Sequence, residues 1–340
     1  MHFTGIDVHS TQSTLQHMIE DGCLGIDLQM PTREECFTEF FNHFDQPSVV
    51  VFEAGRHHWW LNQILQQHPN IKEVKVVDAR RSRKLAEELS VQRGYGRAKN
   101  DRIDAEMLAE MGRRGLAPQI HVPTLEQLSS RSLVRHRSLL LIEHTRSINR
   151  LQGLLGMHGV IIRTNDFFEQ YAAKSEIIAK LPDYTTVIIE HLMEQAGLYD
   201  KQIGAVEAEL DDLLPPGHPA IKLLMTAPGI GIVLSRIICT EIPDIAFFKE
   251  PKYLVSYAGL APIEQDSNGK KLGINLNRYS NHWLKYAFVE AAHHARTHPK
   301  YKHKYESDVK KHGKIRAKLN LARRLTKAVY WMLTRRQSFV

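Results

Sequence analysis

Hydrophobic and polar residues follow two different periods over the first 80 residues. Alternating or continuous apolar segments of five to eight residues are separated by Ser-Thr-Gln and Asp-Gly turn sequences, and longer amphipathic segments lie between the later ones. A meander followed by alternating helices and strands is typical of an α/β layer. We therefore predict strands at 3–8, 14–19, 23–30, 49–54 and 74–78, with helices at 31–44 and 57–68.

Beyond residue 120 the pattern becomes helical. Leu, Ile and Arg recur at helical spacing from about 125 to 155, and a second helical stretch from 184 to 214 ends at Pro215-Pro216-Gly217. Two such helices indicate an antiparallel hairpin or coiled-coil spacer. With boundaries at the proline-containing segments 118–123 and 215–218, we predict an α/β domain over 1–122, a helical spacer over 123–215 and a helical domain over 216–340.

Charge is distributed unevenly along the chain. The net charge is +7, yet residues 270–340 hold 18 Lys and Arg against three acids, and the rest holds 27 against 35. A strongly cationic segment indicates a nucleic-acid partner, although a solvated surface tail would have the same composition. Apolar residues at helical spacing favour a helix with one basic face: Ile315, Leu319, Leu321, Ala322, Leu325, Val329 and Met332.

Several classes of protein are excluded by the composition. No apolar run reaches the roughly 18 residues that a membrane span needs, and the N-terminus lacks a secretory signal, so a cytoplasmic protein is expected. Cys23, Cys36 and Cys239 are too scattered for a disulfide framework or a zinc site. The absence of a GxxxxGK[ST] sequence disfavours a P-loop ATPase or kinase.

Four acidic residues are placed where a metal site could form. Asp7 lies in the first predicted strand, Glu53 ends an apolar strand, and Asp101 and Asp104 are three residues apart on one helix face. Carboxylates are the ligands that Mg²⁺ prefers, and one or two such ions can promote phosphoryl transfer. Asp101 could instead cap its helix. The ordered set is the arrangement of the RNase H-like nuclease fold of Holliday-junction resolvases (RuvC-like).

A second group of residues follows in the C-terminal region. The Pro-Gly-Ile-Gly turn at 228–231 could present backbone N–H groups to a phosphate, or could simply join two helices. Ser267 lies in a loop with Gly269, Lys270 and Lys271, where a hydroxyl could attack a phosphodiester next to stabilising cations. An ordinary turn serine is the alternative interpretation.

Taken together, these motifs resemble the DEDD-type insertion-sequence transposases, a family that includes Piv-like DNA invertases and bridge-RNA-guided recombinases. The resemblance extends over nearly the whole chain, through GIDVH, FEA, KNDRIDA, PGIG, YAGLAP and DSNGKK. It implies an RNase H-like N-terminal domain and a C-terminal transposase domain. It also implies that Asp7, Glu53, Asp101 and Asp104 bind Mg²⁺ or Mn²⁺, and that Ser267 is the nucleophile.

The resemblance further implies a DNA recombinase that forms a covalent phosphoserine intermediate on donor and target DNA. A structured guide RNA and a homodimer or homotetramer are the implied partners. Two alternatives remain: a metal-dependent nuclease that uses water, and a non-catalytic regulator whose acids pair with Arg80, Arg81 and Arg102. Candidate nucleic-acid contacts are Gly229, Gly231, Lys270, Lys271, Arg278, Arg323 and Arg324.

Overall fold

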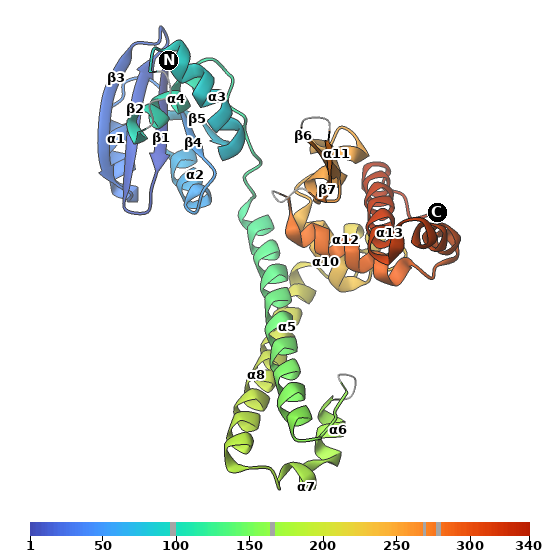
Figure 1. Cartoon of the computed structure of the whole chain (residues 1–340). Helices are drawn as coiled ribbons and strands as arrows, with labels where there is room; N and C mark the ends of the chain where they lie inside the picture. The colour runs from blue at the N-terminus through green and yellow to red at the C-terminus, as the bar shows by residue number, and fades with distance from the viewer. Residues whose placement is uncertain (96–99, 164–166, 268–269, 277–279) are drawn as a thin grey trace. The chain divides into compact units, whose positions relative to one another are not determined.

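The computed structural model describes residues 1–95, 100–163, 167–267, 270–276 and 280–340, and only the backbone for 263–267 and 270–276. Contacts divide the chain into two compact units, Met1–Pro123 and Thr124–Val340. Each is described by itself, with the helix and strand labels of Figure 1.

The first unit is built on a mixed sheet. Five strands of its described residues lie in the order β3-β2-β1-β4-β5. β1 pairs antiparallel with β2 and parallel with β4, so β1 and β4 end at the same edge. Ile6 of β1 pairs with Phe52 of β4, which places Asp7 and Glu53 as the next residues of adjacent strands. The strands are β1 (His2–Val8), β2 (Gln12–Ile19), β3 (Leu24–Pro31), β4 (Ser48–Glu53) and β5 (Ile71–Val77).

Helices cover both faces of this sheet (Figure 1). Alternate residues of β4 point to opposite faces of the sheet. Val50 and Phe52 pack on the side of α1 and α2, whereas Val49 and Val51 pack with Leu108 of α4. The mixed α/β prediction is therefore confirmed for this unit. The helices are α1 (Glu34–Asn42), α2 (His58–Gln67), α3 (Ala79–Gln92) and α4 (Asp101–Arg113).

Two details of the first unit differ from the sequence prediction. The helix expected over 31–44 begins only at Glu34, because Pro31 is still part of β3 and pairs with Gln12. α3 was not predicted, since its polar sequence shows little apolar periodicity, with only Ser82, Leu89 and Ser90 buried.

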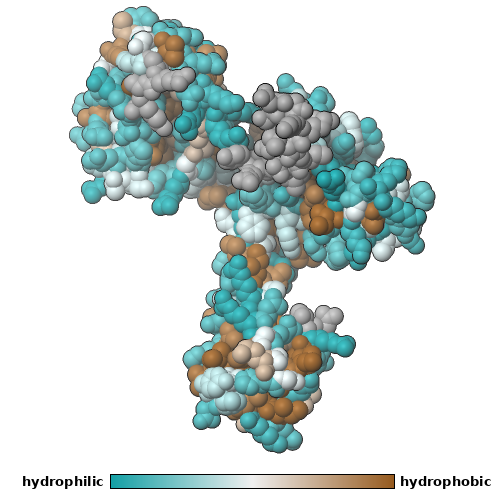
Figure 2. Space-filling model, viewed as in Figure 1, coloured by the Kyte–Doolittle hydropathy of each residue, from teal (hydrophilic) through white to brown (hydrophobic). Residues whose placement is uncertain are grey.

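The second unit begins with the expected long helical hairpin. α5 (Leu125–Met157) and α8 (Asp183–Leu213) form it, with α6 (Phe167–Ala173) and α7 (Ser175–Ile178) between them in the chain. Thr124 and Gln127 form a capping box at the start of α5. Leu151 and Leu155 of α5 pack with Ile189 of α8. Hydrophobic surface gathers around the α6–α7 end (Figure 2), where Met157 and Ile161 are 83% and 73% exposed.

The remaining elements pack around one apolar core. Val134 of α5 and Leu210 of α8 belong to this core, so the base of the hairpin is continuous with it. The prediction of a helical C-terminal region holds except for the antiparallel pair β6–β7. The elements are α9 (Pro219–Met225), α10 (Ile232–Glu241), η1 (Ile245–Phe247), α11 (Pro251–Tyr257), β6 (Pro262–Ser267), β7 (Lys270–Leu276), α12 (His282–Ala295) and α13 (Pro299–Arg335).

α13 contains the cationic sequence and is broken at Gly313, where φ is 79°. After the break, Leu321, Leu325 and Val329 are buried as the apolar spacing predicts. Ile315 is 76% exposed, so its expected place on the buried face is wrong; it lies in the turn directly after the break. None of the helices in the described ranges is long and apolar enough to cross a membrane.

Candidate metal centre

Gly5 allows α4 to lie directly against β1. A Cβ atom at Gly5 would be 1.9 Å from the backbone oxygen of Ala105 and 2.5 Å from the backbone nitrogen of Ala109. Only glycine permits so close an approach. Because α4 starts at Asp101, one turn before Ala105, this contact brings the first turn of α4 to the end of β1 where Asp7 lies.

The side chains of Asp7, His9 and Asp101 meet at this edge of the sheet. Nε2 of His9 is 3.3 Å from Oδ2 of Asp7 and 3.6 Å from Oδ2 of Asp101. One ligand atom from each lies within 4.8 Å of the others, which suits a shared cation. Asp7 is 21% exposed, and the other two are more than half exposed. Among the described residues, this is the group with spacing suitable for a metal.

His9 was not a candidate in the sequence analysis. It lies in the GIDVH motif two residues after Asp7, and alternation along a strand puts residues i and i+2 on the same face. That spacing was the available signal. Mg²⁺ and Mn²⁺ prefer oxygen ligands, so the imidazole is the less usual donor beside these carboxylates.

Burial and neighbouring charges act on the Asp7 carboxyl. Burial is the main effect and raises its pKa, and the carboxylates of Asp101, Asp104 and Glu53 raise it further, whereas His9 lowers it. All four predicted acids therefore share one electrostatic environment, although Glu53 and Asp104 are outside the closest group. Carboxylates that repel one another in this way favour a divalent cation, so the donor set fits the expected ion.

The other two acids lie on β4 and α4. Oγ of Ser82 in α3 donates to Oε1 of Glu53 at 2.5 Å. Asp104 is half-buried in the first turn of α4. That helix is capped by Asn100, whose Oδ1 accepts from the backbone N–H of Ile103 at 2.8 Å. The alternative that Asp101 serves as the cap is therefore wrong, and its carboxylate is directed to His9 instead.

Arg102 does not pair with these four acids in any contact that the described residues show. Its Nε lies 2.7 Å from Oδ2 of Asp27 on β3. The contact ties the first turn of α4 to the edge strand and leaves the Asp101 and Asp104 side chains on their own face of the helix.

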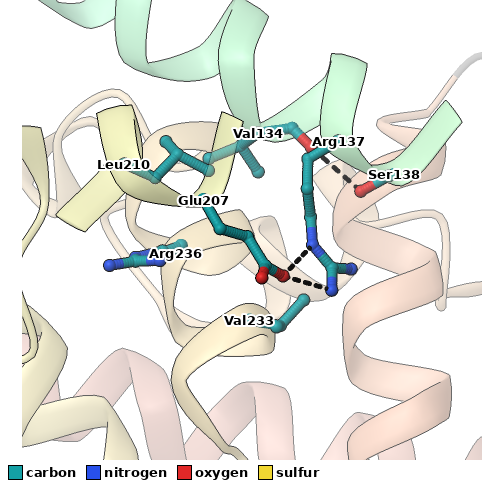
Figure 3. Close-up of a pocket in the computed structure, with 7 residues that line it drawn as sticks. All are labelled: Val134, Arg137, Ser138, Glu207, Leu210, Val233 and Arg236. Carbon is teal, nitrogen blue, oxygen red and sulfur yellow. Dashed lines mark hydrogen bonds and ion pairs between the residues drawn. The ribbon is translucent and has the colours of Figure 1, made fainter. Parts of the chain in front are cut away.

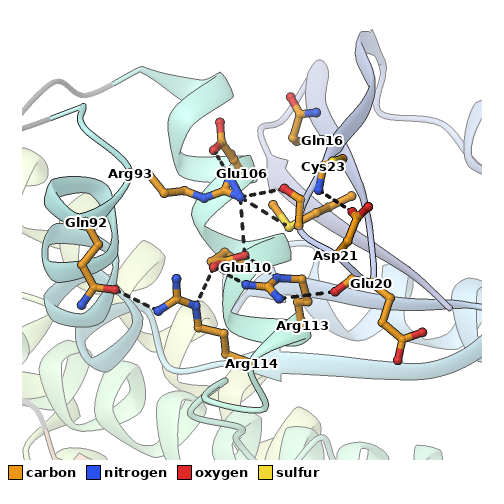
Figure 4. A network of polar contacts seen from close by, with 12 residues as sticks. Gln16, Glu20, Asp21, Cys23, Gln92, Arg93, Glu106, Glu110, Arg113 and Arg114 are labelled. Carbon is orange, nitrogen blue, oxygen red and sulfur yellow. Dashed lines mark hydrogen bonds and ion pairs between the residues drawn. The ribbon is translucent and has the colours of Figure 1, made fainter.

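The second half of α4 is held by a buried cluster of charges (Figure 4). Glu110 is fully buried and accepts from Arg113 and Arg114, and Arg93 lies 3.7 Å away. The hydrogen bonds from Arg113 are the main cause that lowers the pKa of Glu110 to about 2. Glu106 is 1% exposed and accepts from Arg93 at 2.8 Å. Arg93 and Arg113 also donate to the backbone oxygens of Gly22 and Glu20, so this cluster, which was not predicted from the sequence, fixes α4 against the β2–β3 turn.

The candidate residues of the second unit divide into described and undescribed ones. Ser267 pairs through its backbone with Lys270 at the end of β6. Its side chain and those of Lys270 and Lys271 are outside the described residues, as is the whole of Arg278. The nucleophile therefore stays a prediction.

The Pro-Gly-Ile-Gly turn has a packing function. Gly229 has φ +80°, and a Cβ there would be 2.2 Å from the backbone oxygen of Ala291 in α12. The glycine is thus needed for the approach of α12. Gly231 precedes α10 at the N-cap position, with nothing within 4 Å of a hypothetical Cβ, so its surroundings leave room for a ligand.

Arg323 and Arg324 both have intramolecular partners. Nε of Arg323 donates to the backbone oxygen of Leu260 at 2.5 Å, and burial lowers the pKa of Arg323. Nη2 of Arg324 lies 2.9 Å from Oδ2 of the buried Asp308, which joins the two parts of α13 across the Gly313 break. Better candidates for DNA contact are the exposed cations Lys302, Lys304, Lys310, Lys311, Lys314 and Arg316.

Two family models match this chain. One of the DEDD type associated with IS110, described as a transposase, matches residues 4–158, and the other, described as the transposase IS116/IS110/IS902 family, matches residues 221–306. The first contains Asp7, Glu53, Asp101 and Asp104, and the second contains Ser267. Both describe one class of protein, the transposases of insertion sequences.

Curated relatives point to the same class. A putative transposase (y4rJ) of Sinorhizobium fredii is 27% identical over 72% of this chain and 65% of its own length. The transposase for insertion sequence element IS1111A of Coxiella burnetii is 25% identical over 71% and 68%, and that for IS1328 of Yersinia enterocolitica is 25% identical over 57% and 58%. The matched part of the chain thus covers about two thirds or less of the length of each of these relatives. It belongs to the DEDD-type insertion-sequence transposase family.

Proposed function

We propose that this protein cuts and rejoins DNA strands as the recombinase of an insertion sequence. The observation that carries the proposal is the meeting of Asp7, His9 and Asp101 at the end of β1, within the electrostatic reach of Glu53 and Asp104. We assign the N-terminal unit to the RNase H-like fold, which the mixed five-stranded sheet supports. Asp7, Glu53, Asp101 and Asp104 would hold Mg²⁺ or Mn²⁺, with His9 as an added neighbour.

In the proposed reaction, Ser267 is the nucleophile. Its Oγ gives up its proton and forms a bond to a DNA phosphorus, the bond from that phosphorus to a deoxyribose oxygen breaks, and the leaving oxygen takes up a proton. A hydroxyl of another strand then attacks the phosphoserine, which reseals DNA and frees Ser267. A divalent cation bound by the carboxylates would neutralise charge on the phosphoryl oxygens. The role of the carboxylate side chains would be to hold that cation next to the reacting phosphate.

The proposed partners are donor and target DNA, a structured guide RNA and further copies of this chain. Exposed cations on α13 support the nucleic-acid partners. Exposed apolar residues on the helical hairpin support homo-oligomerisation, since such side chains usually pack in an interface: Leu139, Ile142, Val187, Ile188 and Leu198.

A suicide DNA substrate that traps a covalent adduct tests the chemistry directly. With Mg²⁺ or Mn²⁺ present, we expect a protein–DNA adduct from the unaltered protein, none from Ser267→Ala and none from Asp104→Ala, with DNA binding retained in both variants. An adduct from Ser267→Ala would overturn the serine mechanism. Nicked DNA without any adduct would support the water-using nuclease. Activity that persists without a metal would contradict the carboxylate centre.

Neutralising the exposed cations of α13 should reduce the salt dependence of DNA binding. In the variant with Lys310, Lys311 and Lys314 changed to Gln, log K should vary less steeply with log salt, by about one unit for each lost phosphate contact. Fluorescence anisotropy with unrelated duplexes at several salt concentrations measures the slope. Changing the exposed Lys180 and Lys201 to Gln provides a control in the helical hairpin. Equal slopes for all three proteins would identify the α13 cations as solvated surface.

A further inference from the structure

The segment that carries Ser267 is closed at its base by a backbone hydrogen bond. The backbone N–H of Asn281 donates to the oxygen of Tyr257 at 2.9 Å, so the two residues that flank 258–280 in the chain lie together. Ala258 and Leu260 are still buried in the helical core. Tyr257 ends α11, and Asn281 is the N-cap of α12. Contacts that hold Tyr257 and Asn281 together therefore also hold the two chain ends between which β6 and β7 lie.

Glu241 lies at this base and is completely buried. Its two carboxylate oxygens accept from Arg135 of α5, Oε1 from Nε at 2.6 Å and Oε2 from Nη2 at 2.8 Å. Oε2 also accepts from Nδ2 of Asn281 at 2.7 Å. The hydrogen bonds that Arg135 donates to Glu241 are the main cause that raises the pKa of Arg135. The carboxylate of Glu241, at the end of α10, therefore links α5 to Asn281, the N-cap residue of α12.

Asn281 uses its whole side chain in this arrangement. Its Oδ1 accepts from the backbone N–H of Leu284 at 2.9 Å and caps α12, and its Nδ2 reaches both Glu241 and, at 3.4 Å, the hydroxyl of Tyr257. With one oxygen and two N–H donors, an asparagine amide is suited to all three contacts. The hydrogen bond that Asn281 donates to Glu241 therefore orients Asn281 next to Tyr257, where the two ends of the segment meet.

Stability alone does not explain a charged pair in this position. The Glu241 side chain is 1% exposed, and that of its partner Arg135 is 39% exposed. Burying a carboxylate costs so much desolvation that an apolar residue of similar size is often as stable, whereas directed bonds can specify one geometry. The bidentate geometry of Arg135 allows one orientation of the carboxylate. Because Arg135 lies on α5, this long helix takes part in holding residues 258–280 in place.

We propose that Glu241 is a positioning residue for the serine nucleophile. Together with Arg135 and Asn281 it holds both ends of segment 258–280 on α5, so that displacement of α5 is transmitted to β6 and Ser267. This inference rests on the proposed function, in which Ser267 attacks DNA. It assigns no contact between Glu241 and the reacting atoms.

The decisive variant replaces the charged pair by apolar residues, Arg135→Met with Glu241→Leu. This change removes the bond to Asn281 while no charge is left buried without a partner. The matched control is Arg137→Met with Glu207→Leu, because Arg137 lies two residues along α5 and pairs with Glu207 of α8 at 2.7 Å (Figure 3). That pair joins the two long helices, and neither member contacts a described residue of 257–281.

Two measurements on the full chain are compared between these variants. Adduct formation at saturating suicide DNA should slow about 10-fold or more in the Arg135/Glu241 pair variant, because small misplacements of a nucleophile are costly, with a DNA dissociation constant within about 2-fold of the original. Amide hydrogen exchange in residues 262–276 should become faster. The Arg137/Glu207 pair variant should change neither quantity.

A second variant guards against a folding defect. Asn281→Ser keeps a side-chain oxygen to cap α12 but removes the donor to Glu241, and it should show the same two changes. Unchanged adduct rates and unchanged exchange in both variants would overturn the positioning role. If Ser267→Ala itself still forms an adduct, the proposed function fails, and the exchange measurement alone then decides whether Glu241 orders the segment.

Discussion

Gly5→Ala is expected to destabilise the N-terminal unit by about 3 kcal/mol and to slow adduct formation about 100-fold. The new methyl group would be 1.9 Å from the backbone oxygen of Ala105, and a helix backbone has no rotamer by which to avoid it. α4 must move away from β1, and Asp101 and Asp104 move with it. Chemical denaturation of the full chain, combined with hydrogen exchange in β1 and α4, measures the first effect.

Gly55→Ala is the matched control, because Gly55 is in the same unit and nothing lies within 4 Å of its hypothetical Cβ. Its unfolding free energy should stay within about 1 kcal/mol of the original. A Gly5→Ala protein with unchanged stability would show that α4 can shift without loss, and full activity in that protein would remove the link between this contact and the carboxylates.

The five strands of the N-terminal unit were predictable because their signals are local. A continuous apolar run identifies β4, and a short segment bounded by turn residues identifies β1. Parallel pairing then brings Asp7 and Glu53 to one edge. His9 was missed although its spacing from Asp7 fits the same strand face. Asn100 shows the limit of such reasoning, since Asp101 and Asn100 are both good capping residues and only the backbone geometry shows that Asn100 is the cap.

Contacts between distant residues explain the remaining differences. Glu110 is buried with Arg93, and Glu241 with Arg135, over 17 and 106 positions of sequence. Each of these residues resembles an ordinary surface charge when read along the chain. Likewise, Arg323 and Arg324 seemed to be part of a basic face, but Leu260 and Asp308 supply acceptors that helical periodicity cannot indicate.

Glu110→Ala should destabilise the protein by about 3 kcal/mol at neutral pH, since Arg113 and Arg114 lose the carboxylate that both pair with. Glu110 is fully buried beside Arg113, Arg114 and Arg93. Chemical denaturation at pH 7 gives the loss directly. Glu87→Ala is the control, because Glu87 and its partner Arg83 on α3 are each 70% exposed and such pairs contribute roughly 0–1 kcal/mol.

The same residue predicts a pH dependence with a definite sign. The folded pKa of Glu110, about 2, is below the ordinary value of 4.5, so the stabilisation is present above pH 4.5 and is lost as the pH falls towards 2. At about 1.4 kcal/mol per pKa unit, this loss is on the order of 3 kcal/mol. The stability of Glu110→Ala should therefore approach that of the original protein between pH 4.5 and 2. Parallel curves for the two proteins over this range would show that Glu110 does not titrate with folding, whereas Glu87→Ala should parallel the original throughout.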